Sequence, residues 1–194
     1  MSATHHLTTP LSEDAIRALH CGDLVFISGR IITARDAAHK YLAVPEAKLP
    51  PALQLDGMAL YHCGPVIIGS DDAGWQVTAA GPTTSAREET YESTVIQKYG
   101  IRAIIGKGGM GPKTLKACQE FGCAYLSAVG GAAQVLANAV TKVAGVYFRE
   151  EFGSPEAMWL LDVVDFPAIV TMDTHGNDLH KDIRCHSLTK LQQI

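Results

Sequence analysis

The stretch RAIIGKGGMGPKTLKACQEFG, residues 102–122, contains the pattern that decides the fold. Residues 103–105 form a short apolar run that predicts a buried strand. Four glycines follow within residues 106–111, and they allow a tight turn and a close approach to a ligand. Pro112 suits the first position of a helix, and Gly122 suits the left-handed residue after one. The stretch therefore predicts a strand, a glycine-rich loop and a helix, in that order.

The start of this helix is a candidate anion site. Free backbone N–H groups and the positive end of the helix dipole favour an anion there, and Lys107 adds a full positive charge. The alternative is a tight turn with an exposed lysine, but four glycines around one lysine favour the anion site. Nucleotide binding is disfavoured, because no Lys-Ser or Lys-Thr pair follows the glycines and no ribose-binding acid stands at Rossmann spacing.

Composition indicates one globular domain. The chain has 194 residues, of which 47% are hydrophobic, and this is enough for a sizeable core. The net charge of -4 gives no bulk attraction to nucleic acid or to an anionic membrane, so neither is expected as a partner. No secretion signal or membrane span is visible, and the cytoplasm is the expected location.

The cysteines predict neither a disulfide framework nor a metal site. They are odd in number and scattered, and they lack the close repeated spacing of a zinc or iron–sulfur site. Buried, inert thiols are expected for most of them. The five are Cys21, Cys63, Cys118, Cys123 and Cys185.

A second strand-to-helix junction contains Arg35 and Asp36, between a strand expected over 31–33 and a helix expected over 37–42. Thr33 with Asp36 resembles a capping box, which would make both residues structural. Arg35 at this place also suits a carboxylate ligand. The spacing leaves both interpretations open.

A third junction lies in GPTTSAREETYESTVIQKYG, residues 81–100. Ser85 with Glu88 fits a capping box for the helix that follows. Capping explains one hydroxyl, whereas Thr83, Thr84 and Ser85 offer three, followed by Arg87. Such a group at a helix start is well suited to a carboxylate or a phosphate.

The remaining pattern is a β-rich front half followed by alternating strands and helices, which predicts a single α/β or mixed domain. If the three junctions converge, Arg35, Arg87 and Lys107 meet at one edge of the sheet, and a small molecule with two carboxylates is the natural ligand. Other strands are expected over 24–27, 58–61, 66–68, 75–79, 125–129, 146–149 and 165–172, and other helices over 12–22, 132–143 and 154–161.

Five motifs in order resemble the class I, iron–sulfur-dependent hydro-lyases. The resemblance is to the C-terminal domain of class I fumarases and to the separate β subunit of two-subunit fumarases and L(+)-tartrate dehydratases. It implies a swivelling β/β/α domain over 22–181, with mixed sheet and flanking helices, after an N-terminal extension with a short helix over 1–21 and before a tail over 182–194. The motifs are SGRIITARDAAHK, GPTTSAR, IIGKGGM, AVGGAAQ and EFGSPEAMW.

The resemblance implies the reaction and the roles of single residues. The reaction is reversible hydration of fumarate to malate, or dehydration of tartrate to oxaloacetate. Arg35, Arg87 and Lys107 resemble the family's substrate-carboxylate ligands, Thr83 its proposed catalytic base, and Asp36 an acidic catalytic position. The resemblance also implies a [4Fe–4S] cluster and an α2β2 assembly. Because this chain has no credible triad of cysteine ligands, the cluster is expected on a partner α subunit, with no metal on this chain and no activity of the chain alone.

Other functions remain open at this stage. The motifs bind what fumarate and tartrate share, so they do not separate the two substrates, although fumarase is the preferred hypothesis. A non-catalytic domain that binds a small anion for assembly or regulation is the alternative from another class. A threonine base requires a costly alkoxide, and the sequence shows no group that would lower the pKa of Thr83.

Overall fold

Four parallel strands from the middle of the chain form the centre of the fold. The computed structural model describes residues 2–193. In it β2 pairs with β3, β3 with β6 and β6 with β7, all in parallel. Parallel neighbours need a crossover connection, and each crossover here contains a helix. The bounds are β2 Leu24–Thr33, β3 Ala59–Tyr61, β6 Ala103–Gly106 and β7 Ala124–Ser127.

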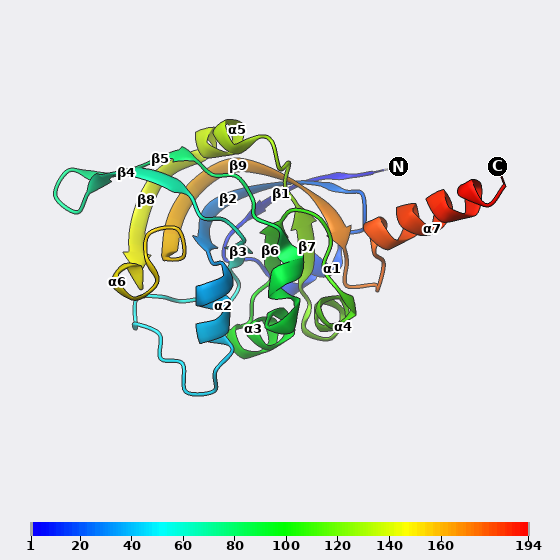
Figure 1. Ribbon diagram of the computed structural model, residues 1–194, viewed down its shortest axis with the longest axis horizontal. Helices are drawn as coiled ribbons and strands as arrows, with labels where there is room; N and C mark the ends of the chain where they lie inside the picture. Colours follow the sequence, from blue (N-terminus) through cyan, green and yellow to red (C-terminus); the bar gives the residue numbers. More distant parts are fainter. Residues whose placement is uncertain (1, 194) are drawn as a thin grey trace.

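The long strand β9 (Met158–Met172) closes this sheet on itself. It runs antiparallel to both β7 and β2, so the pairings form a ring that starts and ends at β2. β1 (Thr4–Thr8) extends the sheet beside β2, and β8 (Val140–Tyr147) pairs with β9. Figure 1 shows β8 and β9 as long curved strands that arch over the shorter ones. The closure pairs backbone groups that would otherwise form open strand edges.

Helices cover the ring. In Figure 1, α2 (Asp36–Leu42), α3 (Glu92–Tyr99) and α4 (Pro112–Phe121) lie together below the sheet, and α5 (Ala133–Asn138) lies above it. The expected α/β class, a mixed sheet with flanking helices, is confirmed. The remaining elements are α1 Glu13–Arg17, the 3-10 helix η1 Ser85–Thr90, α6 Arg149–Phe152, and a separate antiparallel hairpin of β4 Val66–Ser70 and β5 Gly74–Ala79.

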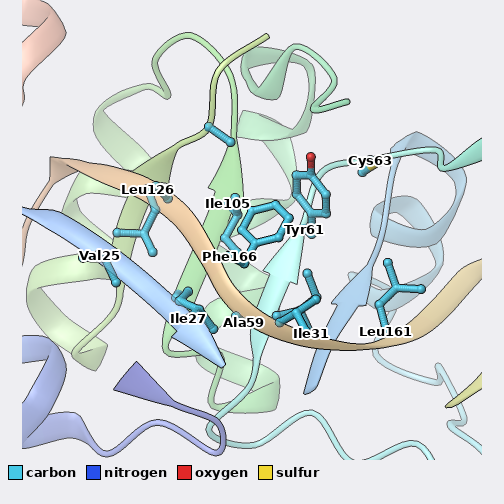
Figure 2. Packing of buried hydrophobic residues seen from close by; sticks show 14 of the residues in the cluster. Val25, Ile27, Ile31, Ala59, Tyr61, Cys63, Ile105, Leu126, Leu161 and Phe166 are labelled. Atoms are coloured by element: carbon cyan, nitrogen blue, oxygen red, sulfur yellow. The ribbon is translucent and has the colours of Figure 1, made fainter. Parts of the chain in front are cut away.

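Alternation along the strands divides the apolar side chains between two cores. Ala103 and Ile105 of β6 belong to the inner core of the ring, whereas Ile104 belongs to the outer core under the helices. Figure 2 shows inner-core side chains from several strands meeting around Tyr61 and Phe166, whose ring centroids are 5.2 Å apart. The ring is therefore filled with side chains rather than hollow.

Two expected helices give way to strands. The helix expected over 132–143 is replaced by β8 from Val140, and the helical turn expected over 154–161 is wrong because β9 begins at Met158. In both places local sequence signals favour a helix. Pairing of β8 with β9 overrides them, because it satisfies the backbone and buries Trp159 in the inner core.

Both ends of the described chain carry regular structure. The segment expected as an N-terminal extension contains β1, paired with β2, as well as the short helix α1. Most of the expected tail lies in α7 (Leu179–Leu191), which buries no residue and projects from the body in Figure 1. Within residues 2–193, no helix combines the length and apolar character that a bilayer span requires.

Replacing Ile105 by alanine should lower the free energy of unfolding by about 2–5 kcal/mol, because the closed ring cannot collapse into the space left. Ile183→Ala removes the same atoms from α7, where the side chain is 55% exposed, and should cost less than ~0.5 kcal/mol. Urea denaturation followed by circular dichroism measures both. Equal losses would contradict the inner core as described.

Candidate active site

The three expected junctions meet at one edge of the sheet. The carboxyl ends of β2, β3 and β6 lie side by side, and the chain leaves them toward Arg35, His62 and Lys107. The segment before η1 is fastened across these ends. The Thr83 N–H donates to the His62 carbonyl oxygen at 2.7 Å, and the Ser85 N–H donates to that of Lys107 at 3.2 Å. The topology therefore brings together residues that are far apart in the sequence.

Arg87 reaches Asp36 at the start of α2. Its Nε and Nη2 donate to the two Asp36 carboxylate oxygens, each at 3.0 Å, in a bidentate pair. Nη2 also donates to Thr83 Oγ1 at 2.8 Å. The hydrogen bonds from Arg87 hold the pKa of the Asp36 carboxyl below its ordinary value. Both side chains are more than 40% exposed, so this group lies on an open face rather than in a closed pocket.

Arg35 is held by a carboxylate that the sequence analysis did not single out. Arg35 Nη2 lies 3.2 Å from Glu156 Oε1 and 4.0 Å from Asp36 Oδ2. The other Glu156 oxygen accepts the Ala37 N–H at 3.0 Å and so caps α2. The capping box expected of Thr33 and Asp36 is wrong, because Thr33 still belongs to β2 and its hydroxyl binds the backbone at the start of β9.

The anion position expected at the start of α4 is filled by a side chain of this protein. Glu89 accepts the N–H groups of Gly111 at 2.7 Å and Lys113 at 2.9 Å, and the hydroxyl of Thr114 at 2.6 Å. A helix start does attract a carboxylate, as expected. The carboxylate comes from η1, however, so the prediction of a ligand at this helix start is wrong.

Lys107 lies beside the Thr83 segment instead. Its backbone forms a parallel bridge with Thr84, and its side chain passes Gly130, where an added Cβ would lie 3.1 Å from Lys107 Cδ. Arg35 and Arg87 each have a carboxylate partner. The Lys107 ammonium has none among residues 2–193, so it can accept a ligand carboxylate without losing an internal ion pair.

A group of buried titratable side chains lies beneath this edge. Glu92 Oε2 lies 3.2 Å from His39 Nε2 and 3.0 Å from His62 Nε2, and these three residues alone in the described part of the chain could share one metal ion. Burial raises the pKa of the neighbouring Glu88 to about 7. Ser85 Oγ lies 2.8 Å from His62 Nδ1, so the capping box expected of Ser85 and Glu88 is wrong.

The cysteines of this chain do not fit an iron–sulfur cluster. Such a cluster needs several thiolates that converge on one point. Cys63 lies in the inner core, Cys118 and Cys123 in the outer core, Cys21 beside Asp173, and Cys185 on exposed α7. We therefore assign no step of the chemistry to a cluster held by this chain.

The family model that describes the C-terminus of fumarases matches residues 2–183. The chain belongs to the fumarase C-terminus family. The resemblance carried by the five motifs is thereby confirmed, and the match includes β1 and the short helix α1 as well as the ring.

Named relatives in the fumarase C-terminus family are of two kinds. The chain is 54% identical over 188 residues to the putative fumarate hydratase class I of Geobacillus stearothermophilus, a match that covers 97% of this chain and 36% of that protein. It thus spans about a third of that relative's length. It is 40% identical to the putative L(+)-tartrate dehydratase subunit beta of Methanocaldococcus jannaschii, covering 95% of each chain. It is 37% identical to the L(+)-tartrate dehydratase subunit beta of Escherichia coli, covering 89% and 85%.

The fumarase-type motifs held one signal for what the sequence analysis overlooked. Glu156 stands in EFGSPEAMW, one of the five quoted stretches, and its partner Arg35 stands in another. His62 adjoins the Gly64-Pro65 turn, and such a turn is usually structural, so the local sequence gives this histidine no functional signal. For Glu89 the sequence indicates only an acidic residue in the first turn of an expected helix. The backbone groups that it binds lie more than 20 residues away. Local spacing does not identify such a partner.

Gly106 ends β6 where an added Cβ would overlap the Ser85 hydroxyl. Gly106→Ala should therefore displace the Thr83–Arg87 segment and lower the free energy of unfolding by about 1–3 kcal/mol. Gly145→Ala is the matched control, because an added Cβ there meets nothing within 4 Å. The denaturant midpoints of the two variants measure this difference in stability. A Gly106→Ala protein as stable as the Gly145→Ala protein would contradict the tight contact.

Proposed function

We propose that this chain is the β subunit of a two-chain iron–sulfur hydro-lyase that adds water reversibly to fumarate, giving malate. The observation that carries the proposal is the gathering of Arg35, Arg87, Thr83 and Lys107, which has no carboxylate partner among residues 2–193, at one open edge of a fumarase-type domain. A dicarboxylate presents charges that this set of cations complements.

The chemistry accounts for the cations. When a proton leaves the carbon next to a carboxylate, that carboxylate must take up extra negative charge. Lys107 and the unused guanidinium N–H groups of Arg35 and Arg87 would stabilise this charge where it develops. Arg87 Nη1 takes no part in the bonds to Asp36 and Thr83, so it remains available to the substrate. Fixed donors would also determine which face of the substrate meets the base.

The arrangement supports Thr83 as the base and gives Asp36 a positioning role. Thr83 Oγ1 would accept the proton as an alkoxide, which is costly in water. The Arg87 guanidinium that donates to this oxygen at 2.8 Å lowers that cost. Asp36 holds Arg87 from the other side with both carboxylate oxygens, so we assign it the orientation of Arg87 rather than contact with substrate.

The other half of the pocket would lie on a partner chain. Arg87 and Asp36 are more than 40% exposed, as expected of one wall of a site that another subunit covers. Two of the relatives carry the name subunit beta, which supports a partner α subunit. On this proposal the α subunit holds the [4Fe–4S] cluster, which would supply the Lewis acid that takes the leaving hydroxyl. The assembly is α2β2 in the cytoplasm, and the chain alone is inactive.

Tartrate is the second candidate substrate. The relatives that this chain matches over 85% to 95% of their length are named L(+)-tartrate dehydratase subunit beta. The higher identity, 54%, is to a putative fumarate hydratase class I. We give fumarate precedence on that identity.

Co-expression with the candidate α subunit, followed by anaerobic assay on malate, fumarate and both tartrate enantiomers, tests the proposal. We expect co-purification of the two chains and turnover of fumarate and malate, with neither chain active alone. Turnover of L(+)-tartrate alone would select the second candidate. Ligand binding by the isolated chain with no partner and no turnover would indicate a non-catalytic anion-binding domain. That result would contradict both the fumarate and the tartrate candidate.

Lys107→Ala and Arg87→Ala should each reduce turnover of the reconstituted complex on the order of a hundredfold or more, because each removes a donor to developing charge. The matched control is Lys116→Ala, which removes an exposed ammonium from α4 and should leave turnover unchanged. Steady-state kinetics on malate provide the measurement. Near-normal rates in both site variants would refute the assigned roles.

A further inference from the structure

Four buried side chains form a chain of contacts beneath the candidate active site. Glu92 Oε2 lies in the middle, 3.2 Å from His39 Nε2 and 3.0 Å from His62 Nε2. On the other side of the second ring, His62 Nδ1 lies 2.8 Å from Ser85 Oγ. None of the four has any exposed surface. We call His39, Glu92, His62 and Ser85 the buried network.

The buried network contains a charge pair. His39 Nδ1 lies 2.9 Å from the carbonyl oxygen of Arg35, which can only accept, so this nitrogen carries a proton. Burial alone lowers the pKa of His39, but attraction to Glu92 and Glu88 outweighs it and raises the pKa to about 9. Burial raises the pKa of Glu92, but the two histidines outweigh it and lower the pKa to about 2. At neutral pH an imidazolium therefore faces a carboxylate.

The second histidine is neutral. Burial lowers the pKa of His62, and the positive charges of His39 and Arg87 lower it further against the attraction of Glu92. A neutral ring has one proton, which belongs on the nitrogen that faces Glu92. The other nitrogen then accepts the hydroxyl proton of Ser85. The placement of charges and ring protons is therefore consistent along the buried network, in which Glu92 makes close charge contacts with both rings.

Both ends of the buried network bind the backbone of site segments. At one end, His39 donates to the carbonyl oxygen of Arg35. At the other end, the Ser85 N–H donates to the carbonyl oxygen of Lys107 at 3.2 Å. The histidine between them accepts the Thr83 N–H on its own carbonyl oxygen at 2.7 Å. The network thus spans all three strand ends from which the site is built.

We infer that the buried network positions the segments that carry Arg35, Thr83 and Lys107, and so acts on the reaction without touching substrate. A buried ion pair contributes little net stability, because the cost of removing both charges from water offsets their attraction. Holding catalytic groups at fixed distances, by contrast, has a large effect on rate. The inference rests on the proposed function, which gives those three residues their roles.

A metal site is the competing interpretation. The donor atoms of His39, His62 and Glu92 lie within 4.8 Å of one another. Only these three donors converge within residues 2–193. The ion pair already neutralises the charge without a metal, and we therefore favour the positioning role.

The kinetic test compares Glu92→Gln with Glu120→Gln, a matched change on the exposed face of α4, in the reconstituted complex. For Glu92→Gln we expect KM for malate to rise and kcat to fall, with kcat/KM reduced at least ~tenfold per folded enzyme. Ser85→Ala should show the same pattern more weakly, and Glu120→Gln should stay within about twofold of the wild type. A lower melting temperature with unchanged kinetic constants would overturn the inference.

A second measurement is independent of activity. In the ¹⁵N-labelled chain, the amide signals of Thr83, Ser85 and Lys107 should shift together in one transition near pH 9, as His39 loses its proton. Glu92→Gln removes the attraction that holds this proton, so the transition should move to lower pH by at least about one unit. Amides that do not follow the transition would overturn the inference. The titratable groups that face the His39 imidazole are Glu88, Glu92 and His62, with Asp36 and Arg87 further out.

Two further outcomes are distinguishable. The purified chain could contain one equivalent of a tightly bound divalent metal that is lost in Glu92→Gln. That result would overturn the positioning role and identify the buried network as a metal site. A wild-type complex that converts none of the four substrates would contradict the proposed function. The amide transition would still test whether the buried network controls the three segments.

Discussion

The parallel pairing of β2, β3 and β6 is the constraint on which the site depends. Parallel strands end at the same edge, so the residues that follow them become neighbours although they are separated by up to about 70 positions. β9 holds the strand ends in place by pairing with β2 on one side and β7 on the other. A ring filled by packed side chains leaves the strand ends little freedom to move apart.

Three anion-attracting positions around the candidate active site are occupied by carboxylates of the chain itself. Glu89 fills the start of α4, Glu156 binds Arg35 and caps α2, and Asp36 holds Arg87. Each pairing fixes a side chain or a helix start before any ligand arrives, which is the condition for electrostatic preorganisation. Lys107 differs, because its ammonium has no such partner within the described residues. Within the part of the chain that the structure describes, the open face thus combines two arginines held by carboxylates with a lysine that has no such partner.

The sequence predicted the parts of this structure that local rules control. The strand, loop and helix around Lys107, and the positions of Arg35 and Arg87 at strand-to-helix junctions, follow from apolar runs and from glycine, proline and hydroxyl signals. The motifs predicted the family. The strands β8 and β9 were mistaken in part for helices, because their conformation is imposed by pairing with each other and not by their own residues.

The sequence predicted several residues that belong to the site, but not which side chains contact one another there. Sequence spacing could not show that Glu89 rather than a ligand occupies a helix start 22 residues away, or that Ser85 binds a histidine rather than its own helix. Nor could it show that His39 and His62, from separate segments, share one buried carboxylate. Such contacts depend on which strand ends become neighbours, and that is a property of the closed ring.

The central claim is that three strand ends of one ring form the carboxylate-binding wall of a dicarboxylate pocket. A crystal structure of the anaerobic two-chain complex with bound malate tests it most directly. We predict a malate carboxylate within hydrogen-bond distance of Lys107 Nζ and Arg87 Nη1, with Arg35 beside it and Thr83 Oγ1 facing the carbon that loses its proton. Malate bound away from these side chains, or a subunit interface that leaves this edge open to solvent, would contradict the account.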